Sequence, residues 1–432
     1  MDTQRLVLFV IFAMSGVMLW DAWQKQNAPP KPANAAISTP AQQNTKTPPK
    51  DVPATTTSPP AASNAGVPNA AAVSPAVPAT AANGSGELID IETDLFVAKV
   101  STVGGVISEI AFKEHRDADD KTKPYLLLQN NAKRYALAQS GLLGEGLPKH
   151  NTLYVAQPGA RKLAAGTDTL ALVLKADTPT GPVTQTLNFK RGMYAIDVAF
   201  DVANTGGAPL QPTAYFQLTR DTVVHQLGGG MGVATYAGPA FYTEDKKFVK
   251  VDFDEIKKLD ADKNRKVPFT EKSDNGWAAM VEQYFVAAWL PAEKTAREYY
   301  VNKIEEKKFA VGAKVPMAAI APGGSGTVNV PLYVGPQEQD KLEAAAKGLD
   351  LVVDYGVFHI IAAPMFKALK FFHSHIGNWG WAIVLLTICI KAIFYPLNER
   401  AGRSMGKMKL VGPKLKQIQE QHATTARSSI KR

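Results

Sequence analysis

Two long apolar runs near the ends of the chain restrict its fold more than any other feature. The first extends from Leu6 to Trp23 with one charge, Asp21, and the second extends from Trp379 to Leu397 with one charge, Lys391. As helices of 18 and 19 residues they would be about 27 and 28 Å long, close to the roughly 30 Å thickness of bilayer hydrocarbon. The sequence therefore predicts two membrane-spanning helices.

The first run is also compatible with a cleaved signal peptide. The triplet Ala33-Asn34-Ala35 has the small-x-small form of a cleavage site, but it lies well beyond the apolar run, behind polar residues and three prolines. Trp20 and Trp23 sit where aromatic anchors meet the membrane interface. We therefore expect residues 1–26 to form an uncleaved N-terminal transmembrane anchor.

The net charge of +9 is concentrated at one end of the chain. Residues 378–432 hold ten basic and two acidic residues, whereas residues 1–377 hold 38 basic and 37 acidic residues. A basic flank after Leu397 marks that side as cytoplasmic by the positive-inside rule. Two spans across a bacterial inner membrane would then place both termini in the cytoplasm and the part between the spans in the periplasm. The nearly neutral exported part argues against DNA binding.

The region between the two runs divides by composition. Residues 27–85 contain 12 of the 29 prolines with Ala, Thr, Ser and Asn, a composition that cannot bury a core. We expect a disordered, partly polyproline linker, with a Pro-rich recognition motif as the alternative. The single cysteine, Cys389, lies inside the second run, so an exported domain would not rely on disulfides.

From residue 86 the residue pattern changes to short β-like runs separated by turn residues. The clearest run, Tyr194 to Val202, alternates apolar and small or acidic residues with the period of two that a half-buried strand shows. Similar runs predict strands at 95–101, 170–174, 183–189, 214–218, 283–289 and 327–334, and a helix is expected at 338–347. Residues 86–348 are therefore predicted to form an antiparallel sandwich of the exported domain.

Helical patterns dominate the remainder. In residues 349–377, Met365, Leu369 and Phe372 share one helical face opposite Lys367 and Lys370, which indicates an amphipathic helix lying in the membrane interface. A helix packed on the sandwich is the alternative. Residues 378–398 form the second span. Residues 399–432 predict a basic cytoplasmic helix, disturbed at Gly412-Pro413, whose lysines are Lys407, Lys409, Lys414 and Lys416.

Lys391 is the residue whose position most needs an explanation. A Lys in mid-membrane costs about 2.5 to 3.5 kcal/mol on insertion scales, so a charge there indicates a functional site. The alternative is snorkelling, since Leu397 is only six residues further on and a long stem could carry the ammonium to the headgroups. The residue alone leaves both readings open. The histidines show no metal-ligand spacing, and no catalytic constellation or cofactor motif is present in the sequence.

Several strings resemble the YidC family of membrane protein insertases of Gram-negative bacteria. They include the anchor with Gln4-Arg5, the Glu92-Thr93-Asp94 segment followed by Gly104-Gly105, and a set near the C-terminus. That set is Leu349-Asp350-Leu351, Val353-Asp354-Tyr355-Gly356, Gly377-Asn378-Trp379-Gly380, Ile390 to Leu397, Ser404-Met405, Lys407-Met408 and Pro413-Lys414-Leu415. The resemblance covers nearly all of residues 1–422.

The resemblance implies a fold and a function. It implies a mainly β periplasmic supersandwich domain joined to membrane α-helices, and insertion and folding of inner-membrane proteins with or without the Sec translocon. Lys391 matches a positive residue, commonly Arg in the family, that lies in a water-filled groove. Nascent membrane proteins, the Sec translocon, the ribosome and anionic lipids are the implied partners, and no cofactor, metal or enzymatic step is required. The family continues through further membrane helices, so we expect this chain to lack most of the insertase core.

A second hypothesis belongs to a different class. Supersandwich folds also serve carbohydrate enzymes, so the exported domain could be a membrane-tethered carbohydrate-binding or epimerase-like protein. This hypothesis requires a concave site in which a histidine, such as His225, faces a carboxylate at catalytic distance.

Overall fold

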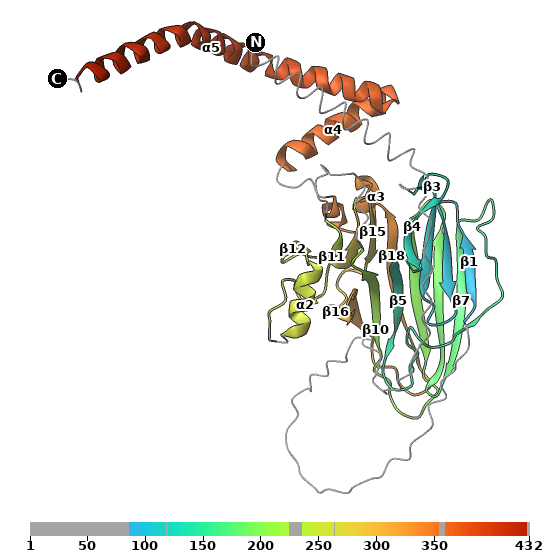
Figure 1. Ribbon diagram of the computed structural model, residues 1–432. Coiled ribbons are helices and arrows are strands. Elements are labelled where there is room, and N and C mark those ends of the chain that lie inside the picture. Colours follow the sequence, from blue (N-terminus) through green and yellow to red (C-terminus); the bar gives the residue numbers. More distant parts are fainter. Residues whose placement is uncertain are drawn as a thin grey trace, which may run out of the picture. The chain divides into compact units, whose positions relative to one another are not determined.

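The computed structural model describes residues 86–117, 120–132, 134–223, 236–262, 264–353 and 359–429. For His359 and residues 407–429 it describes the backbone alone. The predicted anchor, residues 1–26, and the predicted linker, residues 27–85, lie outside the described residues. Figure 1 shows the strands and helices in sequence colours.

Two nine-stranded sheets hold most of the described residues between 86 and 336. In spatial order the first sheet is β1 (Leu88–Glu92), β2 (Phe96–Ser101), β3 (Ile107–Arg116), β4 (Pro124–Asn130), β5 (Tyr135–Leu143), β10 (Thr213–Asp221), β17 (Lys308–Pro316), β16 (Arg297–Glu305) and β13 (Lys272–Ser273). The second sheet is β12 (Lys247–Lys250), β11 (Gly238–Thr243), β14 (Trp277–Val281), β15 (Phe285–Trp289), β18 (Ser325–Pro336), β9 (Ala195–Ala203), β8 (Gly181–Lys190), β7 (Thr169–Thr178) and β6 (Val155–Ala156).

Every pairing between these named strands is antiparallel. One continuous apolar core contains side chains from both sheets, among them Phe96, Phe200, Phe216 and Trp289. Phe216 of the first sheet and Trp289 of the second have ring centroids 5.0 Å apart, which shows the two layers in contact. The predicted mainly β sandwich is confirmed.

The alternation of residues in β9 shows which side chains of this strand face the core and which face away from it. Ile196, Val198, Phe200 and Val202 are at most 1% exposed and face the core, while the residues between them are half-buried or exposed. Because successive side chains point to opposite faces of a strand, a period of two buries one face only. The predicted strand at 194–202 agrees with β9 to within one residue at each end.

Five helical segments complete the described chain. They are α2 (Phe253–Ala261), α3 (Gln339–Ala345), the 3-10 turn η1 (Leu349–Val352), α4 (His359–Ile376) and α5 (Trp379–Ser429). The expected helix at 338–347 is confirmed as α3. In α5 the helix continues through Gly412 and Pro413, so the disturbance expected there does not end it.

A short turn joins the two C-terminal helices. Gly377 has φ of +70°, a left-handed conformation that favours glycine, and its N–H donates to the His373 carbonyl at 2.7 Å to end α4. The Asn378 side chain then accepts from Gly380 N at 2.8 Å and caps the N-terminus of α5. The Gly377-Asn378 pair therefore fixes where α4 ends and α5 begins.

Candidate membrane-insertion site

The first part of α5 is long and apolar enough to cross a membrane. The 28 residues Trp379–Gly406 have a mean hydropathy of 1.9 over their most apolar stretch, of which 6% is buried. Large side chains stand exposed along it, among them Trp381, Ile388, Ile393, Phe394 and Leu397. Within the described residues no protein layer covers this helix, so it requires an apolar surrounding such as lipid.

Lys391 lies in the middle of this exposed apolar stretch. Its side chain is exposed, and within the described part of the chain it forms no ion pair. The nearest carboxylate along the helix, Glu399, pairs with Arg403 one turn further on. Among the described residues, Lys391 is thus a positive charge without a carboxylate partner, surrounded by side chains that favour hydrocarbon.

Helical geometry divides the surroundings of Lys391 into two sides. Thr387 and Tyr395, four residues before and after, lie on the same side of α5 as Lys391. Cys389, two residues before, lies on the opposite side, because two residues turn a helix by about 200°. Thr387 donates its hydroxyl to the Ile383 carbonyl at 2.8 Å, so its polarity is satisfied within the helix.

The predicted basic residues after the span lie in the same helix. Arg400 and Arg403 are exposed. The backbone at Lys407, Lys409, Lys414 and Lys416 is helical, as predicted, and their side chains lie outside the described part of the structure. A continuous α5 therefore carries the apolar stretch and the basic stretch on one helix.

The amphipathic pattern of α4 is incomplete. Leu369 and Phe372 are half-buried, but Ile360 and Phe371 are 84% and 60% exposed and fall on the side of Lys367. Exposed apolar side chains therefore lie on both sides of this helix. Lys370 forms an ion pair with Asp340 of α3 at 2.6 Å, and His373 stacks on Trp379 of α5 at 3.8 Å between ring centroids.

A charged cluster buried in the sandwich was not predicted. Glu282, which follows β14 of the second sheet, contacts Arg134 beside β5 and lies 3.6 Å from Arg220 of β10, both from the first sheet. Tyr125 donates its hydroxyl to Glu282 at 2.6 Å. Burial, followed by the nearby Arg134 charge, lowers the pKa of Arg220 to about 10.

The cluster is a structural link between the sheets. The adjoining cavity is about 10 Å³, which leaves room for one water at most. The Nε atoms of Arg134 and Arg220 are buried without a partner among the described residues, so a water there would have donors to accept from. No sugar could enter such a space. No local pattern could have revealed the cluster, since its members are up to 148 residues apart.

The described residues do not form the histidine–carboxylate site that the carbohydrate-enzyme hypothesis requires. His225 lies outside them. His150 is buried with its Nδ1 2.6 Å from the Tyr215 hydroxyl, and His115 packs between the rings of Phe112 and Phe285. Across the described ranges, no group of three or more metal-ligating side chains is present. The described histidines are thus dispersed.

Two family models match successive parts of the chain. Residues 88–368 match the family model of the YidC periplasmic domain, and residues 371–431 match that of the 60Kd inner membrane protein. A membrane protein insertase YidC of Nitrosospira multiformis is 46% identical over 98% of this chain and 74% of its own length. That of Aromatoleum aromaticum is 43% identical over 97% of this chain and 73% of its own length.

Two solved structures align with more than half of this chain at low TM-scores. A galactose mutarotase-like protein of Lactobacillus casei is 10% identical and covers 57% of this chain and all of its own, with a TM-score of 0.37. A galactose mutarotase related enzyme of Lactobacillus acidophilus gives 9% identity over 57% of this chain and a TM-score of 0.36. Likeness at this level carries no argument about function.

Proposed function

Because this chain belongs to the YidC family of membrane protein insertases, we propose that it inserts and folds inner-membrane proteins, with Lys391 as the charge that receives polar parts of the client. The chain is an inner-membrane protein with a periplasmic domain. Nascent membrane proteins are its substrates in this proposal, with the Sec translocon, the ribosome and anionic lipids as further partners.

The observation that carries the proposal is the unpaired Lys391 in an exposed apolar helix. A positive charge at that depth costs about 2.5 to 3.5 kcal/mol, so α5 needs something that offsets this cost. An acidic segment of a client would do so, because opposite charges attract strongly where water is scarce. The same attraction would lower the cost of moving the client's carboxylates through the membrane.

The remaining regions take supporting roles in the proposal. Residues 1–26 anchor the N-terminus, 27–85 give reach, 86–348 form the periplasmic domain and 349–377 lie in the interface. Residues 378–398 span the membrane, and 399–432 lie in the cytoplasm, where Lys407, Lys409, Lys414 and Lys416 face anionic lipid or ribosomal RNA. Both termini are then cytoplasmic. Insertion by charge attraction needs no enzymatic step.

The test is a charge series at Lys391 in lipid vesicles. Two forms are reconstituted in separate vesicles: the chain itself, and a chimera in which the chain replaces the matched part of the Nitrosospira relative. Protease protection then measures how much of a client with an acidic tail is inserted. Lys391→Gln should lower insertion by about tenfold, equivalent to 1.4 kcal/mol, whereas Lys391→Arg should retain it because the charge remains.

Arg403→Gln is the matched control, since it removes an equal charge beyond the apolar stretch. It should leave insertion within about twofold of the unchanged chain, as a charge in the aqueous region is screened. Equal insertion by Lys391→Gln and the unchanged chain, across several clients with acidic tails, would refute the proposed role of Lys391.

A further inference from the structure

A cleft lies between helix α2 and strand β16 of the first sheet, two elements that contact each other (Figure 1). Its neighbour β13 pairs with β16 only at Arg297 and Glu298, so the rest of the strand borders α2 and the segment that follows it. The cleft measures about 420 Å³, and its lining comes from α2, residues 265–271, β16 and Lys314 of β17. We call it the α2–β16 cleft.

Both walls of the α2–β16 cleft are anchored in the core. Ile256 of α2 and Phe269 are buried, and the Phe269 ring stacks on Phe241 of β11 with ring centroids 4.1 Å apart. Arg265 joins the walls, since its guanidinium donates to both carboxylate oxygens of Glu255 in α2, at 2.6 and 3.1 Å. The cleft is therefore preformed, and a preformed site loses less conformational entropy on binding.

A nearly buried ion pair lines the cleft. Lys314 and Glu298 lie opposite each other on β17 and β16, and the Lys314 ammonium donates to Glu298 at 2.7 Å. Lys314 is 7% exposed and lies 5.7 Å from the centre of the Tyr300 ring. Tyr300 is 8% exposed, and its hydroxyl donates to Gln217 at 2.8 Å. Because a nearly buried ion pair is costly unless hydrogen-bonding groups surround it, polar groups of a ligand would be favourable here.

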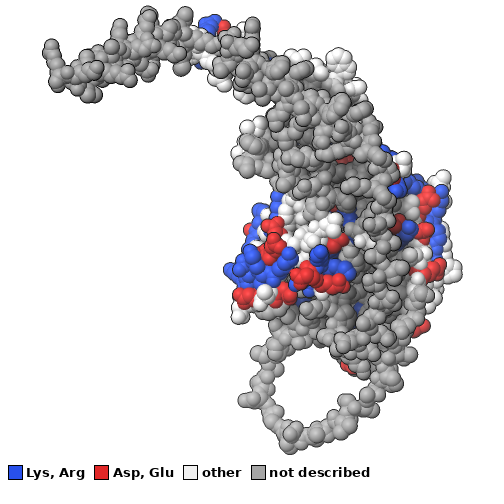
Figure 2. All heavy atoms as spheres, viewed as in Figure 1, with Lys and Arg blue, Asp and Glu red and all other residues white. Residues whose placement is uncertain are grey.

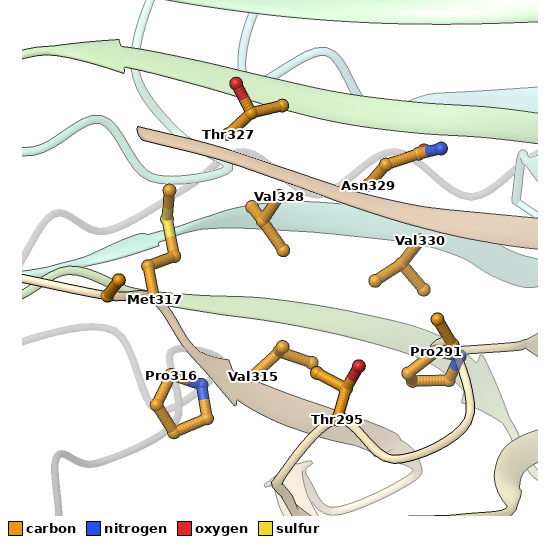
Figure 3. Close-up of a pocket in the computed structure, with 11 residues that line it drawn as sticks. Pro291, Thr295, Val315, Pro316, Met317, Thr327, Val328, Asn329 and Val330 are labelled. Atoms are coloured by element: carbon orange, nitrogen blue, oxygen red, sulfur yellow. The ribbon is translucent and has the colours of Figure 1, made fainter. Parts of the chain in front are cut away.

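The charged side chains of the lining balance one another. Three are basic and three are acidic, namely Arg265, Lys303, Lys314, Asp260, Glu271 and Glu298. A ligand with a net charge of either sign therefore gains little attraction, and an apolar ligand would desolvate these groups without bonding them. The cavity of about 240 Å³ between the end of β17 and the start of β18 differs, because no charged residue lines it (Figure 3).

This mixture of charges suits hydroxyl groups, because a hydroxyl donates to a carboxylate and accepts from an ammonium. A ligand with several hydroxyls would bond both members of the Lys314–Glu298 pair at once. Half-buried Val267 and Val301 lie among the charged residues of the lining and offer apolar contact to C–H groups. The cleft also falls within the range of about 300–1,000 Å³ that is usual for small-molecule sites. These requirements together describe a neutral saccharide.

We propose that the α2–β16 cleft binds a neutral saccharide, whose hydroxyls donate to Glu298 and accept from Lys314 while a C–H face packs on the Tyr300 ring. The proposal concerns binding alone and includes no chemical step. It goes beyond the proposed function, because the cleft lies in the periplasmic domain and uses no residue of α5.

Calorimetric titration of the full chain, in a detergent without a sugar headgroup, measures the binding. The probes are glucose, galactose, maltose and lactose as neutral sugars, with glucuronate and glucosamine as charged sugars. At least one neutral sugar should bind with a dissociation constant of about 1 mM or tighter, and both charged sugars should bind more weakly. Absence of binding by all four neutral sugars, or tighter binding of a charged sugar than of any neutral one, would overturn the proposal.

Glu298→Gln tests the ion pair, because it keeps the size of the side chain and removes the charge. The tightest sugar should lose at least about tenfold in affinity, since hydrogen bonds to charged groups are the stronger ones. Glu305→Gln is the matched control: Glu305 lies in the same strand, pairs with Lys308 at 3.0 Å and does not line the cleft. It should bind within about twofold of the unchanged chain. Equal affinity of the two variants would refute the role of the Lys314–Glu298 pair in binding.

A second measurement locates the sugar without changing any lining residue. In a Cys389→Ser background, Lys266→Cys places a nitroxide label beside the lining residues Arg265 and Val267, and Lys175→Cys places one on β7 of the other sheet. The label at position 266 should broaden the proton NMR signals of the bound sugar more than the label at position 175. Equal broadening by the two labels would overturn the α2–β16 cleft as the site.

Discussion

Charged side chains away from water occur in two opposite arrangements in this molecule. Glu282 is paired with Arg134 and Arg220 inside the sandwich, whereas Lys391 is unpaired on an apolar helix. A buried charge is tolerated when oppositely charged groups surround it, and removing one of them leaves an uncompensated charge. The paired cluster is therefore structural, whereas the role proposed for Lys391 rests on its having no carboxylate partner among the described residues.

The buried cluster gives a prediction about stability. Glu282→Gln should lower the free energy of unfolding by about 3–5 kcal/mol, because Arg134 and Arg220 would then face each other without an anion. Urea unfolding of the full chain in detergent, followed by fluorescence of the buried Trp277 and Trp289, measures this.

Lys257→Ala provides the control for Glu282→Gln. It removes an exposed ion pair with Asp254, 2.9 Å apart, and should change stability by at most about 0.5 kcal/mol. A loss below about 1 kcal/mol for Glu282→Gln would contradict the structural role of the cluster.

The sequence could predict one of these two arrangements and not the other. Lys391 stands out because no other charged residue lies within seven positions of it along the chain, so a local window reveals it. Glu282 and Arg134 look like ordinary charged residues at strand ends, and only the pairing of the two sheets brings them together. Three-dimensional clusters of this kind leave no periodic signal.

Among the elements, burial on one face accounts for only part of what the sequence predicted, since β10 and β15 are buried at nearly every position and were also predicted, at 214–218 and 283–289. The strands β7, β8, β9 and β18 alternate and were found from their period of two. β14 is buried at all five positions and β17 at most of its positions, so neither alternates and both were missed. The nine-residue helix α2 buries only Ile256, which is too little to give a clear helical pattern.

The proposed location of α4 in the membrane interface can be tested at the scale of one element. In a Cys389→Ser background, Met365→Cys and Lys367→Cys place one thiol on each side of the helix, about 160° apart. In lipid vesicles a water-soluble maleimide should label position 367 at least about tenfold faster than position 365, because the thiol at position 365 would lie in hydrocarbon.

Unfolding the chain in urea supplies the control for the labelling. Both thiols should then react at similar rates, which shows that the difference comes from the folded, membrane-bound state and not from the intrinsic reactivity of either thiol. Equal rates in vesicles would contradict an interfacial α4 and favour a helix packed against protein.

For the whole molecule, the distribution of charge agrees with its division into regions. Figure 2 shows basic and acidic side chains intermixed on the coloured part of the sandwich, in keeping with the near neutrality of residues 1–377. Exposed pairs such as Lys113 with Glu92 and Lys347 with Glu244 account for part of this balance. The excess of positive charge lies in the last 55 residues.

The central claim is that an acidic client segment passes the side of α5 that carries Lys391, and disulfide capture during insertion tests it most directly. A client with one cysteine in its acidic tail is inserted by two forms of the chain, one with Thr387→Cys in a Cys389→Ser background and one with the native Cys389 alone. The account predicts a disulfide at position 387, beside Lys391, at least about fivefold more abundant than at Cys389 on the opposite side. Equal capture at both positions, or capture at neither while the client is inserted, would contradict it.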